Sequence, residues 1–192
     1  MQFILFSSND FFIEEHQILT LLFEEGLEVL HIDKITNEPA YYERLLTLIP
    51  SEYHKRIVIS NLFYLKDEYN LKGIHLHNLS EKNNKTSRGN ISIETDELSQ
   101  IHDLKKDYNY VLLNNAMCKY SQEEIKKALD NGIIDKKVYL EINNEENLEW
   151  ATKMNISGIY IRDLLWKHFN MRNSIDFKEL LHQFRVLRRI IN

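Results

Sequence analysis

The chain has 192 residues, of which 43% are apolar and 28% are charged, and its formal net charge is −5. This balance predicts one globular domain, residues 1–192, with a sizeable core, and no apolar run reaches membrane-spanning length. The acidic excess argues against a nucleic-acid-binding protein, because such proteins carry a basic stripe on their surface.

Short β-rich runs alternate with helical spacing of apolar residues along the whole chain. Residues 2–7 are the first expected strand, and this stretch is too short for a signal peptide, so we expect a cytoplasmic protein. Residues 56–78 show the repeating unit: a β-rich run, then Leu62, Leu65 and Tyr69 at helical spacing, then a second β-rich run from Gly73. A crossover of this length joins parallel neighbours.

The same pattern predicts eight strands. They cover residues 2–7, 28–32, 56–60, 73–76, 91–93, 110–113, 137–142 and 158–161. Helices are expected at 13–23, 41–49, 62–71, 98–104, around 125–129, at 145–154 and at 175–191, and residues 79–88 are an expected polar loop. The basic residues Arg185, Arg188 and Arg189 end the last expected helix, where positive charge complements the helix dipole.

Eight strands separated by helices predict a compact, closed (β/α)8 barrel, and an open doubly wound sheet is the alternative. Active sites of such barrels lie at the C-terminal ends of the strands. The residues at those ends are His31, Asp33, Lys34, Ser60, Asn61, His77, Asn78, Glu94, Asn114, Asn115, Glu141, Asn143, Arg162 and Asp163.

The glycines give information about phosphate binding. All five precede a strand and none directly follows one, whereas a backbone phosphate cradle usually needs glycine in the loops after strands seven and eight. We therefore expect that such a cradle is absent or is replaced by side chains.

Several of the strand-end side chains can carry chemistry. Together, His31, Asp33, His75, His77 and Glu94 could line a polar pocket, act as a general acid–base pair on a small heterocycle, or bind zinc or a similar ion. The other interpretation is that His75 packs inside the barrel and His77 is a solvated loop residue. We favour that interpretation over a metal site.

The remaining candidates are weaker. Lys34 and Lys119 could bind an anion or form a Schiff base, but solvated lysines are commoner. The lone Cys118 excludes an internal disulfide and a multi-cysteine zinc site, and with no base nearby it is expected to be buried or inert. Trp166, after strand eight, could cap a pocket.

Three segments resemble the thiamine phosphate synthase/TenI family of compact (β/α)8 barrels. GLEVLHIDKIT at 26–36 is similar to the family's second strand, GIHLHN at 73–78 to its G-V-H-L-G-Q, and YVLLNN at 110–115 to its Y-V-G-L-G-P. The similarity is clearest over 26–36 and 56–78, and it is weaker over 110–119 and 158–163. The resemblance implies ancestry in a thiamine-phosphate diphosphorylase, which is a transferase, or in a thiazole tautomerase.

The family's catalytic pattern departs from this sequence at most positions. The Gln, Arg and Lys that bind the pyrimidine diphosphate fall on His31, Asp33 and Ile35, so the field there changes sign. The magnesium-binding aspartates fall on Ser60-Asn61 and near Ser80. Other family residues fall on Glu94, Asn115, Ile142-Asn143 and Asp163, and only Lys119 lies near the place of the Thr-x-Thr-Lys loop.

The resemblance therefore implies a protein linked to thiamine biosynthesis with a diverged active site. Magnesium is expected for the family, but its carboxylate ligands are replaced, so we expect no magnesium-dependent diphosphate coupling. The expected catalytic residues are His31, Asp33 and Glu94. The expected ligand, thiazole phosphate or thiamine phosphate, would contact Lys34, Ser60, Asn61, His77, Asn78, Asn115, Lys119, Asn143 and Arg162. The alternatives are a non-catalytic or regulatory barrel partnering a thiamine biosynthetic enzyme, and an intact synthase; the sequence leaves a homo-oligomer open.

Overall fold

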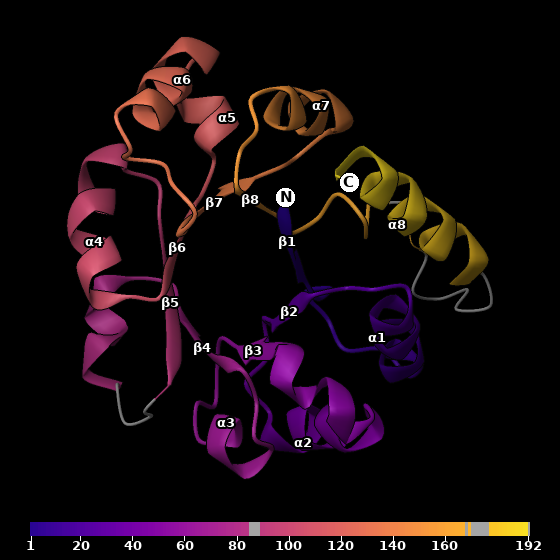
Figure 1. The fold of residues 1–192 in the computed structure, drawn as a ribbon. Coiled ribbons are helices and arrows are strands. Elements are labelled where there is room, and N and C mark those ends of the chain that lie inside the picture. Colours follow the sequence, from indigo (N-terminus) through magenta and orange to yellow (C-terminus); the bar gives the residue numbers. More distant parts are fainter. Residues whose placement is uncertain (85–88, 168, 170–176, 192) are drawn as a thin grey trace.

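The computed structural model describes residues 1–84, 89–167, 169 and 177–191. Its eight parallel strands form a closed barrel in which each strand pairs with the next and β8 pairs with β1. Figure 1 shows the strands at the centre with the helices around them, which confirms the (β/α)8 barrel over the open sheet. No helix in the described part of the chain is both long and apolar enough to cross a membrane.

The strands are short and nearly continuous in apolar residues, because the barrel buries both of their faces. Their bounds are β1 Gln2–Phe6, β2 Val29–Ile32, β3 Ile57–Ile59, β4 Gly73–Leu76, β5 Asn90–Thr95, β6 Tyr110–Leu113, β7 Val138–Glu141 and β8 Gly158–Ile161. The expected bounds hold for β4, β6 and β8, and β5 extends further at both ends than expected.

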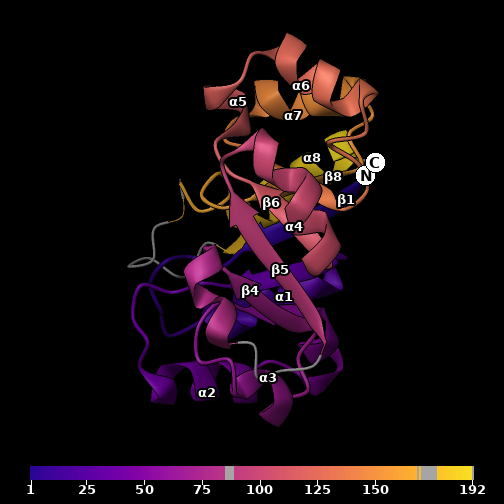
Figure 2. The same cartoon turned by 90° about the vertical axis from the view of Figure 1, so that its left-hand side faces the viewer.

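The helices cover the outside of the barrel. They are α1 Glu15–Glu24, α2 Pro39–Leu48, α3 Leu65–Glu68, α4 Ile101–Asp107, α5 Ala116–Lys119, α6 Gln122–Asp130, α7 Glu145–Lys153 and α8 Phe177–Ile191. Short 3-10 helices cover Ser51–Arg56, Leu79–Asn84 and Leu98–Gln100. Figure 2 shows that α8 ends beside the start of β1, and Met1 and Ile191 line the same small cavity.

Two expectations between β3 and β5 need correction. The helix expected over 62–71 is reduced to the four residues of α3, because Leu62 (φ 50°) and Asn70 (φ 54°) take the left-handed conformation on either side of it. The expected loop at 79–88 begins with the 3-10 helix Leu79–Asn84, and residues 85–88 lie outside the described part, as do 175–176 of the last expected helix.

Apolar side chains divide between the inside of the barrel and the layer under the helices. The inside holds a small cluster of Ile4, Phe6, Tyr110, Leu112 and Tyr160, whereas the much larger cluster lies between strands and helices. Gly73 allows β4 and β5 to approach, since a Cβ there would lie 2.1 Å from the backbone oxygen of Asn90. The strand ends on this framework carry the polar side chains.

Candidate functional site at the barrel mouth

Four charged side chains form one layer at the C-terminal mouth of the barrel. Side chains along a strand alternate between faces, so a residue two positions beyond an inward-facing one also points inward. Arg162 follows Tyr160 in this way, and the same spacing relates Asp33 to His31, His77 to His75, and Glu94 to Ser92. All four residues of the inner layer, His31, His75, Ser92 and Tyr160, are fully buried.

The four charged side chains close a ring of ion pairs. Imidazole nitrogens of His77 lie 3.3 Å from Asp33 Oδ1 and 3.0 Å from Glu94 Oε1. The guanidinium of Arg162 donates to Asp33 Oδ2 at 2.7 Å and to Glu94 Oε2 at 2.8 Å. With His77 protonated, the ring holds two cations and two anions. The solvated interpretation of His77 is therefore wrong.

The ring fixes the protonation of its members. Hydrogen bonds to Asp33 and Glu94 raise the pKa of His77 to about 10. Burial alone would raise the pKa of Glu94, but hydrogen bonds from His75 and His77 outweigh it and hold that pKa well below its usual range. The pKa of Asp33 is lowered in the same way, with burial opposed by His77 and Arg162.

Beneath the ring lies a neutral polar layer. His31 Nε2 lies 2.7 Å from the Tyr110 hydroxyl, and His75 Nδ1 lies 3.0 Å from Ser92 Oγ. Burial lowers the pKa of both histidines, so both imidazoles are neutral. The interior position expected for His75 is confirmed, and His31 lies with it inside the barrel, 0% exposed. The catalytic role of His31 stays a prediction.

Phe6 connects the two layers. The Arg162 guanidinium lies 4.0 Å from the centre of the Phe6 ring, and His31 and His75 contact the same ring. The aromatic face attracts the cation and holds the guanidinium over the Phe6 ring. Arg162 is therefore positioned from below by the aromatic ring of Phe6 and from the sides by the carboxylates of Asp33 and Glu94.

Lys34 lies away from this ring of charges. Its ammonium pairs with Glu15 of α1 and donates to the backbone oxygens of Ser8 (2.8 Å) and Asp10 (3.2 Å). These contacts use all three of its donors, and the residue is buried, so the solvated interpretation is wrong. Burial raises the pKa of Glu15 and lowers that of Lys34.

The ends of β3 and β4 carry polar side chains. At the positions where the family resemblance places magnesium-binding aspartates, these side chains are not carboxylates. Ser60 is buried, and its Oγ makes no hydrogen bond among the described residues. Asn61 donates from Nδ2 to Lys34 O and to the Tyr42 hydroxyl, both at 3.3 Å. Asn78 is exposed and accepts from the Ser80 backbone N–H at 3.0 Å.

The opposite side of the mouth is more exposed. Asn115 (φ 51°) donates its backbone N–H to Glu141 Oε2 at 2.7 Å. Lys119 pairs with Asp96 and Glu97 at the surface. Asn143 is half-buried in the loop that leads into α7.

Two further expectations concern Cys118 and Trp166. Cys118 is exposed and carries a free thiol, so it is not buried, and the other part of the expectation, that the thiol is inert, stays a prediction. Trp166 is 8% exposed and donates from Nε1 to Phe6 O at 2.8 Å, which ties the loop after β8 to the end of β1. It therefore packs against the barrel.

Sequence reasoning placed Asp33, His77, Glu94 and Arg162 at the mouth but did not pair them. The signal that could have paired His77 with Glu94 was the matching spacing of His75-x-His77 and Ser92-x-Glu94 on neighbouring strands. The supporting hydroxyls of Ser92 and Tyr110 were missed, because an inward hydroxyl in an apolar strand resembles any other core position.

The fold and this mouth define a small (β/α)8 barrel with a charged, polar site at the strand ends, where barrels of this class hold their active sites. A crystal structure of thiamine phosphate pyrophosphorylase from Bacteroides thetaiotaomicron matches with 35% identity and TM-score 0.93, covering 100% of this chain and 98% of that chain. The chain belongs to the thiamine phosphate pyrophosphorylase (thiamine phosphate synthase) family, which confirms the resemblance read from its motifs.

More distant structures share the fold alone. A native KDPGal structure has 8% identity and TM-score 0.65 and covers 100% of this chain and 96% of that chain. The tryptophan synthase alpha chain from Legionella pneumophila subsp. pneumophila has 12% identity and TM-score 0.62 and covers 99% of this chain and 91% of that chain. Neither the protein-family models nor the curated proteins gave a match.

Proposed function

We propose that the chain acts in thiamine biosynthesis by binding a small phosphorylated ligand, thiazole phosphate or thiamine phosphate, at the barrel mouth. We further propose that it does not perform magnesium-dependent coupling of a pyrimidine diphosphate. One observation carries this proposal: Asp33 stands where the family resemblance places a diphosphate-binding arginine, and its carboxylate is held by Arg162 and His77. A carboxylate there repels a diphosphate.

The positions of the magnesium ligands support the same conclusion. Magnesium prefers hard oxygen ligands such as carboxylates, at short range and in octahedral geometry. The corresponding positions carry Ser60, Asn61 and Ser80, and the amide of Asn61 is already hydrogen-bonded to Lys34 O and Tyr42. These residues do not fit a magnesium ion that bridges a diphosphate, so the proposed function includes no magnesium-dependent step.

Arg162 is the group best placed to bind a phosphate ester. Its planar guanidinium can donate two parallel hydrogen bonds to phosphate oxygens, as it now does to Asp33 and Glu94. Binding then requires Arg162 to exchange one carboxylate for the phosphate, while His77 stays paired with both carboxylates. The ring would thereby select a monophosphate over a more highly charged diphosphate.

Thermal shift on the purified chain tests this proposal. The ligands are thiazole phosphate, thiamine phosphate, and pyrimidine diphosphate with and without magnesium. We expect stabilisation by the thiazole or thiamine ligand and a loss of that effect in Arg162→Met, with Arg185→Met, whose exposed guanidinium pairs with Glu25, as the matched control. Stabilisation by the diphosphate only with magnesium, together with turnover, would instead identify an intact synthase.

A second candidate function, a non-catalytic barrel that partners a thiamine biosynthetic enzyme, is favoured by an exposed apolar patch. Ile13, Tyr41 and Leu48 are 76%, 54% and 44% exposed and surround a cavity of about 140 Å³ between α1 and α2. Exposed apolar groups of this kind are typical of protein contacts. The absence of any thermal shift with all ligands would favour this second function.

A further inference from the structure

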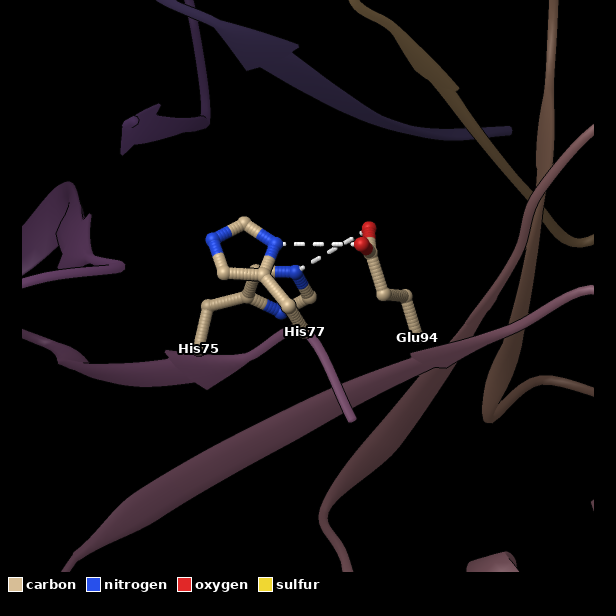
Figure 3. Close-up of side chains that lie close together, drawn as sticks. All are labelled: His75, His77 and Glu94. Atoms are coloured by element: carbon tan, nitrogen blue, oxygen red, sulfur yellow. Dashed lines mark hydrogen bonds and ion pairs between the residues drawn. The ribbon is translucent and has the colours of Figure 1, made fainter. Parts of the chain in front are cut away.

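Two histidines and one glutamate point at a common centre in the barrel mouth. His75 and His77 are separated by two positions along β4 and its end, so both rings lie on the inner face. β5 runs beside β4 with His75 opposite Ser92, which places Glu94 beside His77. Figure 3 shows both imidazoles directed at the Glu94 carboxylate.

The distances suit coordination as well as hydrogen bonding. One ligand atom from each of the three side chains lies within 4.8 Å of the other two. His77 Nδ1 is 3.0 Å from Glu94 Oε1, and His75 Nε2 is 3.4 Å from Glu94 Oε2. In tetrahedral coordination with bonds of about 2.0–2.1 Å, neighbouring ligand atoms lie about 3.3–3.4 Å apart. Small side-chain adjustments therefore bring an ion within bonding distance of all three.

The nitrogens that face away from this centre are already oriented. His75 Nδ1 lies 3.0 Å from Ser92 Oγ, and His77 Nε2 lies 3.3 Å from Asp33 Oδ1. Histidines that bind metals usually hydrogen-bond through the other nitrogen to such a group, which fixes the ring. His77, protonated in the ring of charges, releases its Nδ1 proton to solvent when the ion binds, and its Nε2–H stays with Asp33. The site therefore has both its ligands and their supports.

We propose that His75, His77 and Glu94 bind one divalent transition-metal ion, represented by Zn²⁺, at the mouth of the barrel. Two imidazoles and a carboxylate are the ligand set of many catalytic zinc sites, in which the fourth position is open to water or substrate. Imidazole nitrogen does not suit magnesium, so this ion is distinct from the one the family's chemistry would use. The proposal concerns the ion alone and does not depend on the thiamine-related ligand proposed above.

Arg162 opposes the ion and so provides a test. Its Nη2 donates to Glu94 Oε2 at 2.8 Å, which leaves Oε1 as the freer oxygen and places a positive charge next to the centre. Removing that charge should strengthen metal binding. If Zn²⁺ instead bound to a surface histidine elsewhere on the chain, its affinity would be the same in Arg162→Met as in the parent chain.

The experiment is a calorimetric titration of the metal-stripped, untagged chain with Zn²⁺, paired with Co²⁺ absorption, because Co²⁺ of low coordination number absorbs visible light far more strongly than the aquated ion. We expect one ion per chain, intense Co²⁺ bands and no competition from excess Mg²⁺. Glu94→Gln and His77→Asn should each weaken binding by at least about 100-fold, and Ser92→Ala by about 10-fold. His102→Asn, which changes an exposed histidine on α4, is the matched control.

Arg162→Met should bind Zn²⁺ more tightly than the parent chain. Circular dichroism confirms that each variant is folded, and the near-isosteric Glu94→Gln gives a second reading if His77→Asn unfolds. Three results would each overturn the proposal: no Co²⁺ bands with the parent chain, unchanged affinity in folded Glu94→Gln, or an equal loss of affinity in His102→Asn.

Discussion

Replacing Arg162 with methionine removes the guanidinium that joins Asp33 to Glu94 and keeps an apolar chain over the Phe6 ring. Breaking a fully buried ion pair costs about 3–5 kcal/mol, whereas an exposed pair contributes about 0–1 kcal/mol. The side chains of Arg162, Asp33 and Glu94 are 23%, 14% and 12% exposed, so this ring lies between those limits. Since His77 still pairs with both carboxylates, we expect a loss of about 2 kcal/mol.

The assay is urea unfolding at neutral pH with a chelator present, together with a thermal melt. For a chain of this size, 1 kcal/mol corresponds to about 2–4 °C, so Tm should fall by about 4–8 °C. A double-mutant cycle with Asp33→Asn should give a coupling energy of about 1 kcal/mol or more. Arg185→Met, which breaks the exposed pair with Glu25, should leave Tm nearly unchanged. A fall of less than about 1 °C in Arg162→Met would refute the energetic role of the ring.

Three further predictions concern the ring, the core and the barrel wall. The pKa of His77 is raised from 6.5 to about 10, so the stability that it contributes is fully present below pH 6.5 and is lost as pH rises through about 10. Urea unfolding of the metal-free chain across this range should show that decline, and His77→Gln should not show it. Lys34→Met leaves Glu15 buried without its cation and should cost about 3–5 kcal/mol in urea unfolding, whereas the double variant with Glu15→Gln should recover part of it; equal losses in both would contradict the pairing. Gly73→Ala drives a Cβ to 2.1 Å from Asn90 O and should lower stability by about 3 kcal/mol, against about 1 kcal/mol for Gly132→Ala (φ 67°), where nothing lies within 4 Å; equal melts would refute the close approach.

The barrel could be predicted because each strand is an apolar run followed by a helical pattern. The short helices were harder, since four residues show no periodicity. α5 begins after Asn115 in the left-handed conformation, and α3 lies between two such residues, Leu62 and Asn70. Asn favours this conformation more than most residues, but most Asn residues do not adopt it, and Leu has no such preference, so the sequence did not predict these positions.

The site could be predicted as a set of residues but not as a set of contacts. The spacing of two along each strand places Asp33, Glu94 and Arg162 at the mouth. Which of them meet depends on the stagger between strands and on side-chain rotamers, and these belong to the closed barrel. Lys34 is the clearest example of a contact that could not be predicted. Its partner Glu15 lies on the buried face of α1, and nothing in the sequence indicated that a charged residue there would meet Lys34.

The pairing of β1 with β8 makes the order of synthesis matter. Gln2 pairs with Gly158 and Leu5 with Ile161, so one edge of β1 stays unpaired until β8 has been synthesised. Contacts this distant in sequence slow folding, because chain entropy is lost before they form. Until then the open edge of β1 can pair with another chain. Released nascent fragments that stop before β8 should therefore aggregate, and a chaperone that shields this edge should raise the yield of folded protein.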